Sequence, residues 1–270
     1  MDATDAAGAE HDAGAHTSRW PIVAAGGAAA LYVGAGVAMA GGDALPSTPP
    51  LVVAALGLAV LVGGLAGWTR EAFLGGGAHT THGEKRSRLY VGGMWLFLLS
   101  DLATFAAGFV YYAFVRSGTW PPSELPPLLG SLVLANTAIL LASSVTVHFA
   151  HDALEAGERQ RFLGLLGGTV LLGAVFLVGQ AYEYYEFITA ESFTLSDGVY
   201  ASAFYGLTGL HGLHVTLGVV MLAILFVRAL RGGYAAGGDT SVRTVSLYWH
   251  FVDAVWVFLV AVLYVGAVVG

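Results

Sequence analysis

Seven apolar stretches, each long enough to cross a lipid bilayer, dominate this sequence of 270 residues. A transmembrane helix needs roughly 20 apolar residues, and such stretches lie near 20–42, 50–68, 89–115, 128–150, 162–185, 199–228 and 245–269. With 56% hydrophobic and 11% charged residues, the chain is too apolar for a soluble domain of this size. We therefore expect an all-α, polytopic membrane protein with seven transmembrane helices.

The positive charges test this count of seven. With seven spans, the N-terminus and the connections at 69–88, 151–161 and 229–244 share one side of the membrane. Of the eleven lysines and arginines, only Arg116 falls on the opposite side. Because positive residues remain on the cytoplasmic side, we expect the N-terminus inside and the C-terminus outside.

Composition also predicts how the chain is divided. We expect an acidic, disordered tail at 1–19, transmembrane helices 1 and 2 at 20–68, a polar cytoplasmic connection at 69–88, and a bundle of five helices at 89–270. The chain has no cysteine, which excludes disulfides, iron–sulfur clusters and thiolate-bound copper. Its net charge of −7 argues against nucleic acid as a partner.

One acid lies deep in an apolar stretch. Asp101 is near the middle of the third span, in MWLFLLSDLATF. An ionised carboxylate at that depth costs roughly 2.5–3.5 kcal/mol on insertion scales. Asp101 must therefore be protonated, paired or hydrated. An acid that only links two helices and an acid that takes part in proton transfer both fit this position.

Two histidines, His211 and His214, lie at similar depth in the sixth span. They are three residues apart and so lie on one helix face, where they can bond a neighbouring helix. Alternatively, His211 and Asp101 form a proton-linked site. The sequence leaves open whether these two side chains touch.

A second group of polar residues lies toward the cytoplasmic ends of the fourth and seventh spans. It contains His148, His151, His250 and Asp253. Imidazole and carboxylate suit several metals, but histidines that are hydrogen-bonded between helices are the favoured interpretation, and we expect no metal site. His250 and Asp253 are expected to form a structural polar pair, with each other or with the neighbouring helix.

Four motifs in a fixed order carry a resemblance to a known family. They are AYEYYEF at 181–187, SDGVYASAF at 196–204, TGLHGLHV at 208–215 and YWHFVDAVWVFL at 248–259. Together they resemble the subunit III family of haem–copper terminal oxidases, of the cytochrome c oxidase type, over roughly residues 50–270. The family usually has glutamate at the position of Asp101, and a second histidine where this chain has Asp152.

The resemblance implies an accessory membrane subunit of a proton-pumping oxidase in aerobic electron transport. Such a subunit packs against the catalytic subunit I in a complex with subunit II, seats phospholipids, supports proton uptake and stabilises the catalytic core. It holds no catalytic centre, and the haems and copper lie in its partner subunits. A V-shaped cleft separates helices 1 and 2 from helices 3 to 7. Trp68 and Arg70, in the run GWTRE, would hold lipid headgroups in that cleft.

Three alternatives stay open from the sequence. They are a quinol-oxidase subunit III, a cytochrome b-type electron carrier with histidine haem ligands, and a proton-linked transporter that uses Asp101 and His211. The expected location is the plasma membrane of a prokaryote, with the mitochondrial inner membrane less favoured.

Overall fold

The computed structural model describes residues 19–40, 48–70, 84–117, 127–128, 130–234 and 240–269. Seven helices in these ranges are long and apolar enough to cross a membrane, which confirms the expected fold class. They are α1 (Trp20–Ala40), α2 (Thr48–Thr69), α3 (Glu84–Arg116), α4 (Ser131–Glu155), α5 (Arg159–Thr189), α6 (Val199–Leu230) and α7 (Thr240–Leu259). The expected tail, up to residue 18, and most of the 69–88 connection lie outside the described residues.

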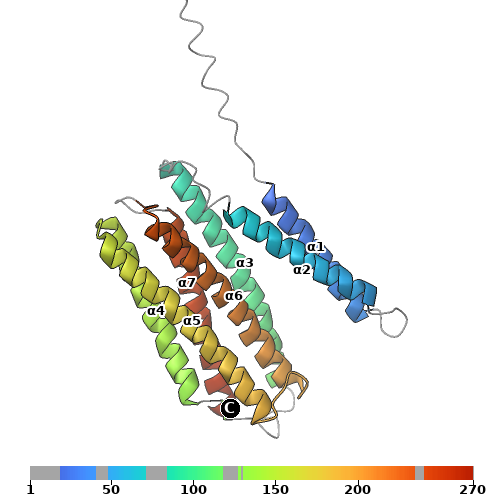
Figure 1. Ribbon diagram of the computed structural model, residues 1–270. Coiled ribbons are helices and arrows are strands. Elements are labelled where there is room, and N and C mark those ends of the chain that lie inside the picture. Colours follow the sequence, from blue (N-terminus) through green and yellow to red (C-terminus); the bar gives the residue numbers. More distant parts are fainter. Residues whose placement is uncertain are drawn as a thin grey trace, which may run out of the picture. The chain divides into compact units, whose positions relative to one another are not determined.

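The chain divides into two compact units, one containing α1 and α2 and the other containing α3 to α7 (Figure 1). Each unit is described on its own below. The V-shaped cleft expected between them stays a prediction.

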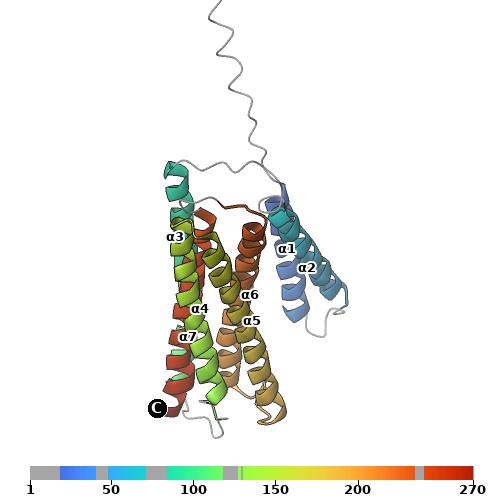
Figure 2. The same ribbon diagram turned by 60° about the vertical axis from the view of Figure 1, so that its left-hand side comes forward.

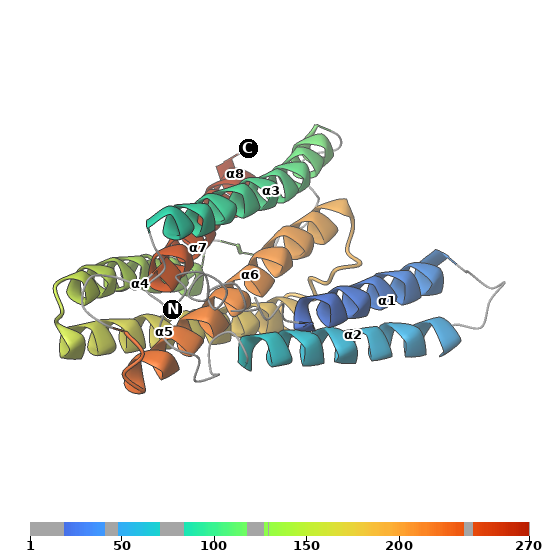
Figure 3. The same cartoon turned by 90° about the horizontal axis from the view of Figure 1, so that it is seen from above.

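In the first unit, α1 and α2 run side by side with their backbones in close contact (Figure 3). A Cβ atom added at Gly57 would lie 2.3 Å from the backbone nitrogen of Leu31. One added at Gly27 would lie 2.3 Å from the backbone nitrogen of Leu61. Only glycine allows so close an approach, which is a common way to join helices in lipid.

The sequence points to other glycines, at Gly63/Gly67 and Gly164/Gly168, whose spacing of four residues is typical of close helix contacts. Three of these four glycines do not meet another helix in the part of the chain that the structure describes. Among the described residues, nothing lies within 4 Å of a Cβ built at Gly63, Gly164 or Gly168, whereas Gly67 meets the ring of Trp20. In a glycine-rich helix the spacing recurs on several faces, so it does not tell which face meets a neighbour.

In the second unit, α4, α5, α6 and α7 form a closed ring. α4 packs on α5, α5 on α6, α6 on α7, and α7 on α4. α3 packs outside this ring, against α6 and α7 (Figures 1 and 2).

The ring has the residue pattern of a left-handed helical bundle. Buried positions of α5 recur at intervals of four and three residues: Phe162, Leu166, Thr169, Gly173, Phe176, Gln180, Glu183 and Phe187. This seven-residue repeat keeps one seam of each helix against its neighbours along the whole bundle. The seam of α5 includes three polar residues, so the interior of the ring is not uniformly apolar.

α7 continues through a π-helical segment, η3 (Val260–Val265), into α8 (Gly266–Val269). Carbonyls of this segment accept hydrogen bonds from other helices. The Tyr112 hydroxyl donates to the carbonyl of Val262 at 3.2 Å, and the Tyr200 hydroxyl donates to that of Leu263 at 3.0 Å. The wider turn also leaves two consecutive side chains, Leu263 and Tyr264, fully buried.

Candidate functional site

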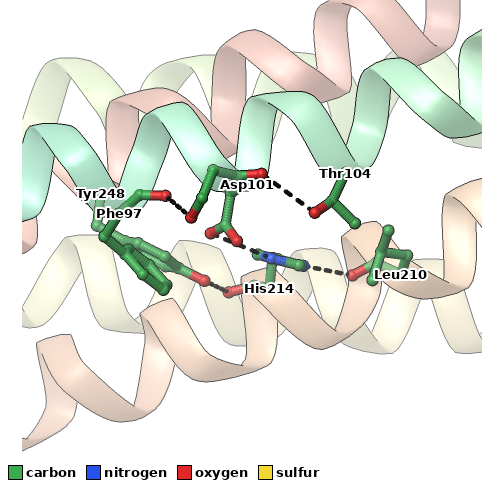
Figure 4. A network of polar contacts seen from close by, with 7 residues as sticks. Phe97, Asp101, Thr104, Leu210, His214 and Tyr248 are labelled. Carbon is green, nitrogen blue, oxygen red and sulfur yellow. Dashed lines mark hydrogen bonds and ion pairs between the residues drawn. The ribbon is translucent and has the colours of Figure 1, made fainter.

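Asp101 on α3 faces His214 on α6 (Figure 4). Asp101 Oδ2 lies 3.4 Å from His214 Nε2, and each side chain is 16% exposed. The structure therefore pairs the deep acid with His214 rather than with His211. Three residues turn a helix by about 300°, so the two histidines point roughly 60° apart. That angle is enough to direct them toward different neighbours.

A hydrogen bond of the His214 ring shows which of its nitrogens faces Asp101. Its Nδ1 lies 2.8 Å from the carbonyl oxygen of Leu210. A carbonyl only accepts, so Nδ1 carries hydrogen, and Nε2 is the nitrogen left to face Asp101. Asp101 Oδ2 has no hydrogen-bond partner among the described residues, so the imidazole and the carboxylate lie close together without a hydrogen bond.

Aromatic rings fix the position of His214. The Tyr248 hydroxyl donates to the His214 carbonyl at 3.0 Å, and the two rings stack with centroids 6.5 Å apart. Phe105 lies on α3, one turn beyond Asp101, with its ring centroid 5.1 Å from that of His214. Side chains from α3 and α7, together with the Leu210 carbonyl of α6, thus define where the imidazole lies.

His211 has entirely different surroundings. It is fully buried, its ring stacks on Trp256 with centroids 5.1 Å apart, and the ring of Phe176 is perpendicular to it with centroids 6.0 Å apart. Neither ring nitrogen has a hydrogen-bond partner among the described residues. His211 therefore belongs to the interior of the ring, and His214 to the contact between α3 and α6.

His250 and Asp253 meet through a third residue. His250 Nδ1 lies 3.0 Å from the Ser144 hydroxyl of α4, and that hydroxyl also donates to Asp253 Oδ2. A hydroxyl that donates to the carboxylate can still accept a hydrogen bond from the imidazole. The two side chains of α7 are thus joined through the neighbouring helix, α4.

The histidines of α4 each lie near an acid of the same helix. No three histidine or acidic side chains of the described residues come together in a possible metal site. His148 lies 3.7 Å from Asp152, and His151 lies 3.7 Å from Glu155, each one turn along the same helix. These histidines are therefore engaged with acids of α4 itself.

The sequence prediction missed Glu183. This carboxyl is only 2% exposed, and the hydroxyl of Tyr264 donates to its Oε2 at 3.3 Å. We expected the span to end near residue 185, among tyrosines typical of a membrane interface. In the structure α5 continues to Thr189, and Glu183 lies on the buried seam. The available signal was its spacing of seven residues from Phe176.

The residues expected to bind lipid lie at the end of α2. Trp68 is 40% exposed and Arg70 is exposed as well. Glu71, the acid of the same run, lies outside the described residues. An exposed indole and guanidinium at a helix end match the composition of a membrane interface.

The comparisons with known proteins all indicate the same family. The family model described as "Cytochrome c oxidase subunit III" matches residues 15–268. "Cytochrome c oxidase subunit 3" of Tetraodon nigroviridis is 39% identical over 260 residues, which cover 92% of this chain and 94% of the relative. The protein of the same name from Cyprinus carpio is 38% identical with the same coverage. That of Felis catus is 41% identical over 70% of this chain and 72% of its own length.

Proposed function

This chain belongs to the cytochrome c oxidase subunit III family, and from that premise we propose that it supports proton uptake, seats phospholipid and stabilises the catalytic subunit of its complex. As an accessory subunit, it acts within the oxidase. Its relatives are named as cytochrome c oxidase subunits, which does not favour the quinol-oxidase alternative.

The pair of Asp101 and His214 is the observation that carries the proton-linked role. It lies within two membrane spans, at the contact between α3 and the ring, and it brings together a carboxyl and an imidazole, two side chains that can each carry a proton. Its partial exposure leaves a path for a proton to reach it from outside the bundle. A group with these properties at the edge of a subunit is suited to supply protons to a neighbour.

The outer face of α3 supports the proposed contact with subunit I, beside subunit II. α3 is the least buried of the seven spans. Large side chains on it are more than half exposed: Leu89, Trp95, Leu96, Leu99, Val110 and Phe114. Apolar surface of this extent faces lipid or another membrane protein. We place the subunit I contact on part of this face, with the haems and copper held by the partner subunits.

Phospholipid is proposed to bind at Trp68 and Arg70. An arginine at headgroup level can donate two parallel hydrogen bonds to a phosphate, and an indole prefers the membrane interface. Both side chains are exposed at the end of α2, as this role requires.

We propose a respiratory membrane as the location. The relatives compared above are vertebrate proteins, which points toward the mitochondrial inner membrane rather than the prokaryotic plasma membrane expected from the sequence.

Replacing Asp101 by Asn in the assembled oxidase tests the proton-linked role. A residue of the oxygen chemistry would lower the rate about 100-fold or more, whereas we expect initial O₂ reduction to remain within about twofold of wild type. Proton uptake should fall, or the active lifetime under sustained turnover should shorten, because the amide cannot exchange a proton with His214. Stopped-flow pH measurements and the decay of oxygen consumption give both quantities.

Asp253→Asn is the matched control, because it changes a second deep acid that contacts Ser144 and not His214. The proposal fails if Asp101→Asn abolishes the first turnovers of a fully assembled complex. It also fails if Asp101→Asn and Asp253→Asn change proton uptake and lifetime equally.

A further inference from the structure

Four polar side chains lie at buried positions of the ring formed by α4 to α7. They are Asn136 of α4, Gln180 and Glu183 of α5, and His211 of α6, and none is more than 5% exposed. None of them takes part in the Asp101–His214 pair or in the contact at Ser144. They form a separate polar group that the proposed function does not use.

Asn136 of α4 packs on α5 at Gly179, the residue before Gln180. A Cβ added at Gly179 would come within 2.3 Å of Asn136 Oδ1 and 2.6 Å of its Nδ2. The amide of Asn136 therefore lies directly on the α5 backbone, one residue from Gln180. The glycine makes room for the amide at this position.

His211 lies at the same level of the bundle as Gln180. The hydroxyls of Tyr184 and Thr208 are 2.6 Å apart and so fix the register of the antiparallel helices α5 and α6. Gln180 is four residues from this contact along α5, and His211 is three residues from it along α6. At 1.5 Å per residue, the two side chains are level to within about 2 Å. Glu183 lies one turn further along the seam of α5.

Six atoms of this group have no hydrogen bond of good geometry among the described residues: Asn136 Nδ2, Gln180 Oε1 and Nε2, Glu183 Oε1, and His211 Nδ1 and Nε2. The Gln180 amide does lie near the Tyr184 hydroxyl, but that hydroxyl is already bonded to Thr208. The two amide nitrogens are donors, and the two oxygens of Gln180 and Glu183 can accept. A neutral imidazole adds one donor and one acceptor. The six atoms therefore comprise three donors and three acceptors. Nearly all buried polar groups in folded proteins bond to protein or to ordered water.

We propose that the ring of α4 to α7 encloses a small cluster of ordered water bound by Asn136, Gln180, Glu183 and His211. Water both donates and accepts, as this mixed set requires, and buried waters typically make about three hydrogen bonds. An anion would face the carboxyl of Glu183, and an apolar molecule would leave all six atoms unpaired. A metal would lack a third ligand of the usual kinds among the described side chains. This site does not depend on the role proposed for Asp101.

The first test is the density of the intact wild-type oxidase complex at a resolution that shows ordered water. We expect at least one water within hydrogen-bond distance of two or more of these side chains. The proposal is overturned if the space between them is closed and the amides, the carboxyl and the imidazole bond directly to each other.

The second test is hydroxyl-radical footprinting by X-ray radiolysis of the same complex. Bound water generates the radical in place, so a buried side chain beside it is oxidised while a dry one is not. Tyr264, which is fully buried and bonded to Glu183, should be oxidised several-fold faster than Trp249 after each is normalised to its rate in the unfolded chain. Trp249 is the internal control, because it is equally buried and its indole bonds to Ser143.

Gln180→Leu should lower the oxidation of Tyr264 to the level of Trp249, because it removes two of the six polar atoms. Thr169→Val is the matched variant on the same seam. It should leave the oxidation rate of Tyr264 unchanged, because Thr169 bonds to Thr146 and lies three turns from Gln180 along α5. Equal normalised rates for Tyr264 and Trp249 in the wild-type complex refute the proposal, even if Gln180→Leu fails to assemble.

Discussion

The hairpin of α1 and α2 and the ring of α4 to α7 are held together in opposite ways. In the hairpin, glycines bring the two backbones into contact, and no polar residue of the described parts of α1 and α2 is buried. In the ring, large aromatic side chains fill the interior and polar side chains link the helices. Lipid chains are as apolar as leucine, so apolar surface alone does not join helices in a membrane. Close backbone packing and side-chain interlocking are two separate solutions to that problem.

Trp249 shows how glycine serves the ring differently. Its ring lies between Gly173 and Gly218, where an added Cβ would come within 2.8 Å and 2.7 Å of the indole. Its Nε1 donates to the Ser143 hydroxyl at 2.9 Å. In the ring, these glycines leave room for a side chain, whereas in the hairpin they leave room for the backbone of the other helix.

The largest expected effect is that of Trp249→Ala in the ring. Removing a fully buried tryptophan leaves a cavity, so we expect a loss of about 3–5 kcal/mol in the free energy of unfolding. Unfolding in mixed detergent micelles, followed by circular dichroism, measures it. Trp95→Ala, at a site 58% exposed, is the control and should change little. Equal losses at the two sites would mean that the ring does not depend on interlocked side chains.

A smaller effect is expected in the hairpin from Gly57→Val. The new side chain meets the backbone of Leu31, which cannot move as a side chain can, so we expect a loss of about 1–3 kcal/mol. Gly63→Val adds the same side chain to the same helix where no atom of the described residues lies within 4 Å. Because the chain has no cysteine of its own, disulfide cross-linking of cysteines introduced into α1 and α2 reports the pairing. If both variants cross-link like wild type, backbone contact does not hold the hairpin.

The smallest effect is that of Tyr184→Phe, which removes one hydrogen bond between α5 and α6. We expect a loss of about 0.5–1.5 kcal/mol, toward the low end because the Thr208 hydroxyl keeps its bond to the carbonyl of Phe204. Tyr182→Phe, at an exposed position on the same helix, serves as the control. The same unfolding measurement applies, and a loss as large as that of Trp249→Ala would show that polar links, rather than aromatic packing, hold the ring.

The sequence predicted the seven helices because the length of each apolar stretch is fixed by the thickness of the bilayer. It also identified Asp101 as an unusual buried acid, but not its partner. His211 and His214 differ by three residues, and which of them faces α3 depends on how α6 is rotated in the bundle. No feature within one helix determines that rotation.

Glu183 was missed for a related reason. Its neighbours Tyr182, Tyr185 and Glu186 gave the segment the composition of a membrane interface, and local composition outweighed the seven-residue spacing. The spacing of the glycines did not show which of them meet a neighbour, for the same reason that the histidines were left undecided. In each case the sequence identified the residue types, and the packing of neighbouring helices decided which of them met.

The π-helical segment η3 has a consequence for counting residues along the last helix. A π turn contains one residue more than the α pattern, as if a single residue had been inserted without forming a loop. The extra residue changes the phase of the helix by about 100°, so the seven-residue repeat of α7 does not extend to α8. Aligning this helix with a regular one therefore needs a one-residue gap inside 260–265. Without that gap, Tyr264 is matched to a position on the wrong face, and its contact with Glu183 goes unnoticed.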